Sequence, residues 1–251
     1  MSGANDGGTV SGANQHNTVS GSVCVVGRGR AGGSFFAALA TAGWDAMLVA
    51  SDEPVPHSAS LVLLCVPDAA VAAVAATLDI RDDRVVAHCA GSLGLDVLEP
   101  HPRRASIHPL VALSNPTIGS QRLAAGATFA VAGDPIAEEV VAALGGTAIA
   151  VPDGSRAAYH AAACIASNHV VALLGQAERV AAAVGVPLSA YLGLVQGSVD
   201  NVVRLGPAAA LTGPAARNDA DTLDAHRAAL DPSELVAYDV MVDQCRRLVQ
   251  D

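Results

Sequence analysis

Lysine is absent from this chain of 251 residues, so arginine supplies all 14 basic side chains. Enzymes that form Schiff bases use a lysine amine, and several others use lysine as a general acid or base. The sequence therefore excludes every mechanism that depends on a lysine.

Aromatic residues are also scarce, with three Phe, three Tyr and one Trp. Proteins that bind single-stranded nucleic acid use aromatic side chains as stacking platforms, and this chain has little material for one. The net charge of −10 and the lack of a basic stripe argue further against nucleic acid. We therefore expect a small-molecule substrate as partner, and no nucleic acid.

Long apolar runs are missing as well. No stretch of about 18 residues is free of polar side chains, so we expect no membrane span. Residues 1–20 are rich in Gly, Ser, Asn and Thr and lack the basic start and apolar centre of a signal peptide, which predicts a disordered tail. The five cysteines show no CxxC pair and no metal-ligand spacing. They indicate reduced thiols in a cytoplasmic protein without a metal site.

Apolar residues, in contrast, make up 51% of the chain, enough for a sizeable core. Short apolar runs alternate with helix-like stretches, and several runs are apolar throughout, as in strands buried on both faces. The pattern predicts an α/β fold, with a Rossmann-like, doubly wound parallel sheet over residues 21–152. The expected strands are 23–27, 46–50, 60–66, 84–88, 127–132 and 147–151, with a helix at 136–144 before the last one.

Strand signals stop after Pro152. A single long helix is predicted from Ser155 to about Val184, followed by helices at about 188–204, 219–229 and 232–249. We therefore predict an all-helical domain over residues 153–251. In such two-domain proteins the ligand usually lies beyond the carboxyl ends of the strands, in a crevice that the second domain closes.

A glycine triplet is the most informative motif: Val26-Gly27-Arg28-Gly29-Arg30-Ala31-Gly32 follows the first apolar run and opens a helix. Gly27 allows the sharp turn, Gly29 lets the main chain approach a pyrophosphate, and Gly32 lets helix and strand pack closely. The helix N-terminus then faces the phosphates. The motif predicts a dinucleotide site formed by residues 27–32, including Arg28, Arg30 and Ala31; a plain tight turn is the alternative.

The type of dinucleotide depends on the end of the second strand. Ser51 occupies the favoured contact position there, and Asp52 comes one residue later than the acidic residue that binds the ribose of NAD. Arg28 and Arg30 could meet a 2′-phosphate, because an arginine fork matches phosphate geometry. We expect NADP, with NAD as the alternative. A purely structural interpretation is that both arginines are solvated loop residues without a contact to the cofactor.

The ends of two further strands should line the same crevice. Val66 and Pro67 follow one strand, and Gly91 follows the next, so we predict that all three contact the cofactor. The adjacent Asp68 fits a helix cap at least as well as a cofactor contact.

A histidine ends one of these strands. His88 could reach the nicotinamide region and bind substrate, although an isolated histidine at a strand end is more often structural. The segment 106–110, which contains His108, has the same two interpretations.

The long helix contains a polar stripe, because His160, Cys164 and Asn168 are spaced i, i+4, i+8 among apolar residues. If the stripe faces the crevice, His160 would protonate the reduced substrate, Asn168 would orient its carbonyl, and Cys164 would contact it. If it does not, these groups bond to a neighbouring helix or to a second subunit.

A loop between later helices combines a hydroxyl, a flexible turn and a cation. We predict that Arg217 binds a small carboxylate, that Thr212 hydrogen-bonds the reacting oxygen, and that Asn201 belongs to the substrate site. A helix cap and a surface arginine are the alternatives.

These motifs together resemble the bacterial proteins with an N-terminal Rossmann-like domain and a C-terminal DUF2520 domain. The matching segments are 26–32, Cys65-Val66-Pro67-Asp68, 88–92, His108-Pro109-Leu110, Tyr159-His160-Ala161-Ala162, Ala166-Ser167-Asn168 and 210–219. The family usually has Gly where this chain has Asn218.

The resemblance implies an architecture shared with pyrroline-5-carboxylate reductases, hydroxyisobutyrate-type dehydrogenases and ketopantoate reductases, with a helical domain like the C-terminal domain of 6-phosphogluconate dehydrogenase. It also implies a homodimer. Ketopantoate reductases of the usual type carry a lysine on the first helix of that domain, so their mechanism does not transfer, and His160 takes its place by position.

The sequence as a whole predicts an NAD(P)-dependent oxidoreductase. The leading expectation is an NADPH-dependent reductase of a small 2-oxo or imino acid, with ketopantoate (2-dehydropantoate) as the first candidate. Two alternatives remain: a nucleotide-binding sensor or assembly protein without turnover, and an oxidoreductase that links NADP to the deazaflavin F420.

Overall fold

A computed structural model describes residues 21–249, so the tail predicted for residues 1–20 lies outside the described part of the chain. The chain divides into two compact units, the first ending at Ala163 and the second beginning at Cys164. The division falls inside the long helix, eleven residues beyond the predicted boundary at 152/153.

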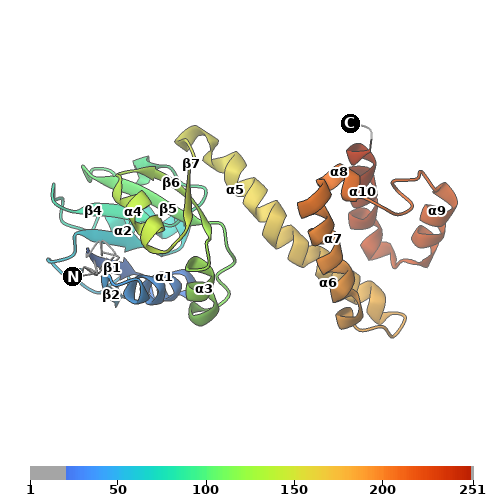
Figure 1. Cartoon of the computed structure of the whole chain (residues 1–251), viewed down its shortest axis with the longest axis horizontal. Coiled ribbons are helices and arrows are strands. Elements are labelled where there is room, and N and C mark those ends of the chain that lie inside the picture. The colour runs from blue at the N-terminus through green and yellow to red at the C-terminus, as the bar shows by residue number, and fades with distance from the viewer. Residues whose placement is uncertain (1–20, 250–251) are drawn as a thin grey trace, which may run out of the picture. The chain divides into compact units, whose positions relative to one another are not determined.

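The first unit is built on one sheet of seven strands (Figure 1). Its strands are β1 (Ser22–Val26), β2 (Asp45–Val49), β3 (Leu61–Leu64), β4 (Val85–His88), β5 (Arg104–Pro109), β6 (Thr128–Gly133) and β7 (Thr147–Ala150). They lie in the order β2-β1-β3-β4-β5-β6-β7. All neighbours are parallel except β5 and β6, which are antiparallel, so β6 and β7 run against the other five strands. The predicted α/β fold is confirmed.

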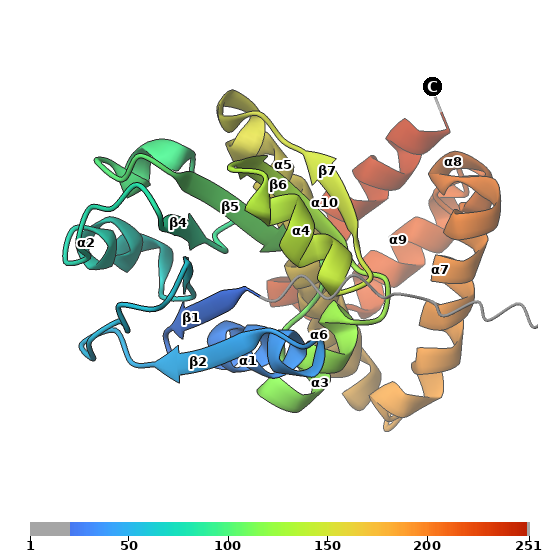
Figure 2. The same cartoon turned by 60° about the vertical axis from the view of Figure 1, so that its left-hand side comes forward.

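Helices cover both faces of this sheet. They are α1 (Arg30–Thr41), α2 (Val71–Ala75), α3 (Pro116–Leu123) and α4 (Ile136–Ala143). On one face, buried residues of α1, α3 and α4, such as Phe35, Leu123 and Val140, pack in one core. Helices α1 and α3 lie side by side in both views (Figures 1 and 2). On the other face, α2 packs over Val62 and Leu64. Because strand side chains alternate between faces, the all-apolar runs noted in the sequence feed both cores.

The long helix begins in the first unit. It consists of α5 (Arg156–Cys164), a π-helical turn at Ile165–His169 and α6 (Val170–Ala182). By length and composition alone, Asp153–Ala182 is long and apolar enough to cross a membrane, and none of its most apolar stretch is buried. The absence of a membrane partner therefore stays a prediction.

Among its described residues the second unit contains helices and connecting loops and no strand, as predicted. After α6 it contains α7 (Leu192–Leu205), α8 (Pro207–Ala210), α9 (Ala220–Ala229) and α10 (Pro232–Leu248). Its buried core is small and centres on Ala215, Leu223 and Val242. The carboxylate of Glu234 on α10 accepts two hydrogen bonds from Arg179 on α6, at 2.6 and 3.0 Å, which ties these two helices together.

Candidate functional site

The glycine turn joins β1 to α1 with the geometry that a nucleotide loop requires. Gly27 has a φ of 112°, a conformation that favours glycine. A Cβ at Gly32 would overlap the carbonyl oxygen of Gly27, whereas a Cβ at Gly29 would meet nothing within 4 Å. The turn is therefore tight at Gly27 and Gly32 and open at Gly29.

The N-terminus of α1 is free of competing groups. Gly29 is the N-cap residue, no side chain caps the helix, and its first turn contains no acidic residue. The first N–H groups of a helix have no partner inside the helix, and the helix dipole favours negative charge there. This end of α1 can hold a phosphate.

The order of the strands places this turn at a switch point. From β1 the chain first goes to β2 on one side and then to β3 on the other side. Ligands of open α/β sheets bind at the carboxyl ends of strands where the order reverses in this way. Cys65 follows β3 at this point, and its N–H donates to the carbonyl of Val26 at 2.8 Å.

A cavity of about 340 Å³ opens beside the glycine turn. It is lined by Val26, Ser51, Asp52, Glu53, Pro54, Val55, Val74, Thr77 and Leu78. Ser51, the residue predicted to contact the cofactor, belongs to this lining. The position at the end of β2 and the size suit the adenosine end of a dinucleotide.

The two arginines of the glycine turn differ in their surroundings. Arg28 forms an ion pair with Glu53, with Nη2 and Oε2 2.7 Å apart, and the same oxygen accepts the N–H of Ala50 at 2.9 Å. Both Arg28 and Arg30 are exposed. Their contact with a 2′-phosphate stays a prediction. For Arg28, the phosphate would have to compete with the carboxylate of Glu53.

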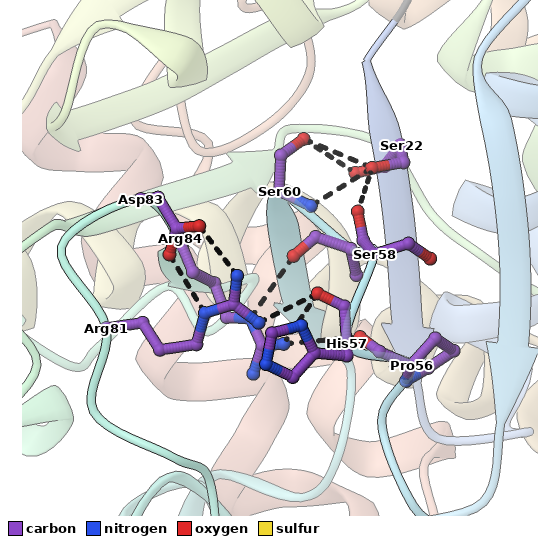
Figure 3. Close-up of polar contacts among 9 residues, drawn as sticks. Ser22, Pro56, His57, Ser58, Ser60, Arg81, Asp83 and Arg84 are labelled. Atoms are coloured by element: carbon purple, nitrogen blue, oxygen red, sulfur yellow. Dashed lines mark hydrogen bonds and ion pairs between the residues drawn. The ribbon is translucent and has the colours of Figure 1, made fainter.

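Two further arginines fix the loop that forms the wall of this cavity (Figure 3). Arg84 is buried and donates to the carbonyls of Ala59 and Pro56, both at 3.2 Å. Arg81 donates to the carbonyl of His57 at 2.8 Å and pairs with Asp83. Residues 56–60 are thus held by their main chain, directly after residues 51–55 that line the cavity.

Asp68, in the loop after β3, does not cap a helix as one interpretation of the sequence expected. Asp68 opens a 3₁₀ turn that has no side-chain cap, so the helix-cap interpretation of this residue is wrong. Its carboxylate instead accepts the hydroxyl of Ser92 at 2.9 Å. The loops that follow β3 and β4 are joined by this bond. Val66 and Pro67 precede it, and their cofactor contacts stay predictions.

His88 is completely buried, and the main chain occupies both of its ring nitrogens. Nε2 lies 3.1 Å from the carbonyl oxygen of Gly94, and Nδ1 accepts the N–H of Ala90 at 3.2 Å. Burial lowers the pKa of His88, so the ring is neutral, with the proton on Nε2. This arrangement favours the structural interpretation of His88, as the residue that holds the loop after β4.

Two histidine rings lie against Gly91 of that loop, and a tyrosine is bonded to one of them. Nδ1 of His108 lies 2.6 Å from the hydroxyl oxygen of Tyr159, and the rings of His108 and His160 meet edge to face with centroids 5.8 Å apart. A Cβ at Gly91 would lie 2.5 Å from Cδ2 of His160 and 2.8 Å from Nε2 of His108. Gly91 is therefore required for the close approach of both imidazoles to the loop main chain.

The His108 ring is neutral at physiological pH. Burial, followed by the charges of His160 and Arg156, lowers its pKa to about 4. Burial raises the pKa of Tyr159, so the phenol keeps its proton. The hydroxyl of Tyr159 can thus donate to Nδ1 of His108, which leaves Nε2–H beside Gly91.

Tyr159 is the residue whose role the sequence did not predict, and His108 was given only the same two interpretations as His88. The signal was the histidine at the end of β5 and the tyrosine next to His160. Among the residues that the structure describes, no group of three His, Cys, Asp or Glu side chains could hold a metal ion.

The remaining predicted residues belong to the helical unit. Asn168 lies in the π-helical turn, so the i, i+4, i+8 spacing from His160 through Cys164 does not give the regular α-helical stripe that was predicted. The hydroxyl of Ser167 donates to Oδ1 of Asn168 at 2.9 Å. Turns of this kind inside α-helices are frequent at functional sites.

The loop 211–219 contains exposed Thr212 and Arg217. Asn218 there has a φ of 53°, a left-handed conformation in which the family's usual glycine is favoured. Asp219 caps α9 through the N–H of Thr222. The substrate roles of Thr212 and Arg217, and of the exposed Asn201 on α7, stay predictions.

The glycine turn, the switch point and the strand order define a Rossmann-like fold. The chain is a protein with a Rossmann-like domain and a DUF2520 domain. The model of the Rossmann-like domain matches residues 45–113, and that of DUF2520, a domain of unknown function, matches residues 127–245. No curated protein sequence matches the chain.

Several solved structures share the fold. Protein TM1727 of Thermotoga maritima is 26% identical, with a TM-score of 0.71 over 91% of this chain and 98% of that one. BF3122 of Bacteroides fragilis, a provisionally assigned NADP oxidoreductase, is 20% identical, with a TM-score of 0.79 over the same shares. A reductive aminase of Aspergillus terreus, in complex with NADPH and ethyl levulinate, is 14% identical, with a TM-score of 0.69 over 91% of this chain and 94% of that one.

Proposed function

We propose that this protein is an NADPH-dependent reductase of a carbonyl or imine group in a small molecule. One observation carries the proposal: within the first unit, the glycine turn follows β1, Gly91 follows β4 and His108 lies near the end of β5, and these three strands are parallel. His160 on α5 packs against Gly91 and His108. The proposed nucleotide site and the side chains that would transfer a proton therefore lie at the same edge of the sheet, where the parallel strands end. The NADPH and NADP named for proteins of the same fold support the choice of cofactor.

The residues of the first unit fit such a cofactor. The N-terminus of α1 and Gly29 would take the pyrophosphate, and the cavity beside Ser51 would take the adenosine. Arg28 and Arg30 would meet the 2′-phosphate, in competition with Glu53 for Arg28. Bound NADPH supplies a hydride.

The reduction also needs one proton, because a carbonyl or imine that gains a hydride gains a negative charge at oxygen or nitrogen. His160 is our proton donor. The neutral His108, hydrogen-bonded to Tyr159, lies against the His160 ring and can pass a proton without carrying a lasting charge. Asn168 would orient the substrate.

The first substrates to test are ketopantoate and a cyclic imino acid such as 1-pyrroline-5-carboxylate. Loss of NADPH absorbance would be followed with each substrate, beside NADH. Turnover that falls at least tenfold in His160→Ala, with NADPH affinity retained, is the expected result. An unchanged rate in His160→Ala and Asn168→Ala would contradict the assignment of the donor.

NADPH binding without turnover on a broad panel of oxo and imino compounds would replace this proposal with the sensor or assembly protein. Bleaching of reduced F420 in the presence of NADP would favour the deazaflavin-linked oxidoreductase. Both measurements use the same purified full-length protein.

We also propose that the protein is a cytoplasmic homodimer formed through its helical unit. Helix α7 has no buried residue, and Leu192, Val199 and Val203, which share one side of it, are 49, 51 and 81% exposed. Isolated chains rarely expose so many large apolar side chains, and a contiguous apolar patch usually marks an interface.

A further inference from the structure

The side chain of Arg156, at the start of α5, is buried without adequate partners. It is 1% exposed, and its Nε, Nη1 and Nη2 atoms are all buried without a hydrogen bond in the described structure. The nearest opposite charge is Asp153, whose Oδ1 lies 3.5 Å from Nε. A buried guanidinium is costly unless hydrogen bonds satisfy it, so this site is suited to an additional acceptor.

A second buried donor without a partner lies on strand β5. The hydroxyl of Ser106 on β5 is buried and has no partner in the described residues. Ser106 is in register with His88 on β4 and two residues before His108, so all three side chains project from one face. His88 cannot satisfy Ser106, because the main chain occupies both of its ring nitrogens.

The charge of Arg156 reaches both histidines beside Ser106. Arg156 lies one helical turn before Tyr159 and His160 on α5, and its charge lowers the pKa of His88 and of His108, although burial lowers each of them more. The other charged or titratable groups near His108 are His160 on α5, Asp68 after β3 and His88 on β4. The two orphaned donors therefore belong to the His108–Tyr159–His160 cluster.

We infer that Arg156 and Ser106 form a subsite for a carboxylate, so that the substrate is an oxo or imino acid. The planar guanidinium presents parallel N–H groups that match the two oxygens of a carboxylate, and the serine hydroxyl adds a third donor. This inference rests on the proposed function, because it names the substrate class of the same site. The loop Ala90–Gly94 is held beside this subsite, because Ser92 donates to Asp68 and the ring of His88 bonds to the carbonyl of Gly94.

The same donors could instead hold a free inorganic anion such as chloride. The experiment separates the two sources by titrating full-length protein, with its histidines isotope-labelled, with oxamate and separately with chloride. Oxamate is a carboxylate that accepts no hydride, and the His108 and His160 ring signals are the readout. Saturable shifts with oxamate that disappear in Arg156→Gln and partly return in Arg156→Lys are expected. Shifts with chloride alone, or oxamate shifts that survive in Arg156→Gln, would overturn the inference.

Kinetics give a second test. We expect the wild type to prefer an oxo acid over its methyl ester, and Arg156→Gln to lower that acid-to-ester ratio of kcat/KM by about 100-fold. Arg103→Gln, which removes an exposed arginine paired with Asp134, is the control and should leave the ratio unchanged. An unaltered ratio in folded Arg156→Gln would contradict the subsite.

Arg156→Gln could fail to fold, because it changes a buried side chain. Ser106→Ala removes only the hydroxyl and should weaken oxamate binding by about threefold to tenfold. If no carbonyl or imine compound is reduced at all, the proposed function fails, while the oxamate titration still decides whether the carboxylate subsite exists.

Discussion

The hydroxyl oxygen of Tyr159 lies 2.6 Å from Nδ1 of His108, although 51 positions separate the two residues in the sequence. The tyrosine comes from the first turns of α5 and the histidine from the end of β5. Their bond joins the long helix to the sheet at the loop that carries Gly91. It also fixes which nitrogen of His108 faces that loop.

This neutral histidine should make stability depend on pH. Its pKa falls from 6.5 unfolded to about 4 folded, so the unfolded chain binds the extra proton between these values. Stability is then fully present above pH 6.5 and falls by about 3 kcal/mol at most as the pH drops towards 4. His108→Gln should flatten this slope in urea titrations at several pH values. His57→Gln, at an exposed histidine, should not, and equal slopes in both variants would refute the argument.

The glycine turn permits a test that separates folding from binding. Gly32→Ala should destabilise the protein by about 2 kcal/mol, because its Cβ overlaps the carbonyl oxygen of Gly27. Gly29→Ala should change stability by less than about 0.5 kcal/mol, because nothing lies within 4 Å of the new methyl group, yet it should weaken NADPH binding. Thermal melts and fluorescence titrations measure the two effects. Normal NADPH affinity in Gly29→Ala would argue against a pyrophosphate at this turn.

The ion pair between Arg28 and Glu53 should set the preference between NADPH and NADH. Glu53→Gln removes the competitor for Arg28, so the NADPH-to-NADH affinity ratio should rise by about threefold. Arg28→Ala should lower the same ratio on the order of tenfold, through loss of a charge-assisted contact. Arg122→Ala, at an exposed arginine on α3, is the matched control. If neither substitution changes the NADPH-to-NADH affinity ratio, the 2′-phosphate binds elsewhere, and Arg30 is the next residue to test.

The exposed apolar face of α7 should hold two copies of the chain together. Val199 and Val203 are one helical turn apart, so Val199→Asp combined with Val203→Asp should shift the protein from dimer to monomer in sedimentation analysis. Ser198→Asp adds charge at a polar position of the same helix and should leave the dimer intact. A wild-type monomer that instead floats with lipid vesicles would assign the apolar surface to a membrane.

Much of the fold followed from local patterns, but the direction of strands did not. Strands β6 and β7 were predicted at nearly their observed positions because apolar runs are bounded by turn residues. An apolar run is the same in either direction, so the antiparallel pairing of β5 with β6 had no signal. Helix α3 was missed because it is short and half polar, although Asn115 caps it and Pro116 opens it, which is a helix-start signature.

The site was predictable where it depends on main chain and less so where side chains meet. The glycine turn and its helix needed only a few consecutive residues. The contact between His108 and Tyr159, and the burial of Arg156, depend on packing between distant segments. The π-helical turn at Ile165–His169 had no recognised signal, and it alters the spacing on which the polar stripe was based.

The clamp of Arg81 and Arg84 on residues 56–60 has a consequence for how the protein can change over time. Both arginines bind main-chain oxygens, which every amino acid provides. Substitutions at Ser51 and Asp52 therefore leave these anchors in place, so that these two side chains at the cavity can vary without releasing the loop. A lineage could exchange one nucleotide for another through a few changes here, at little risk to folding.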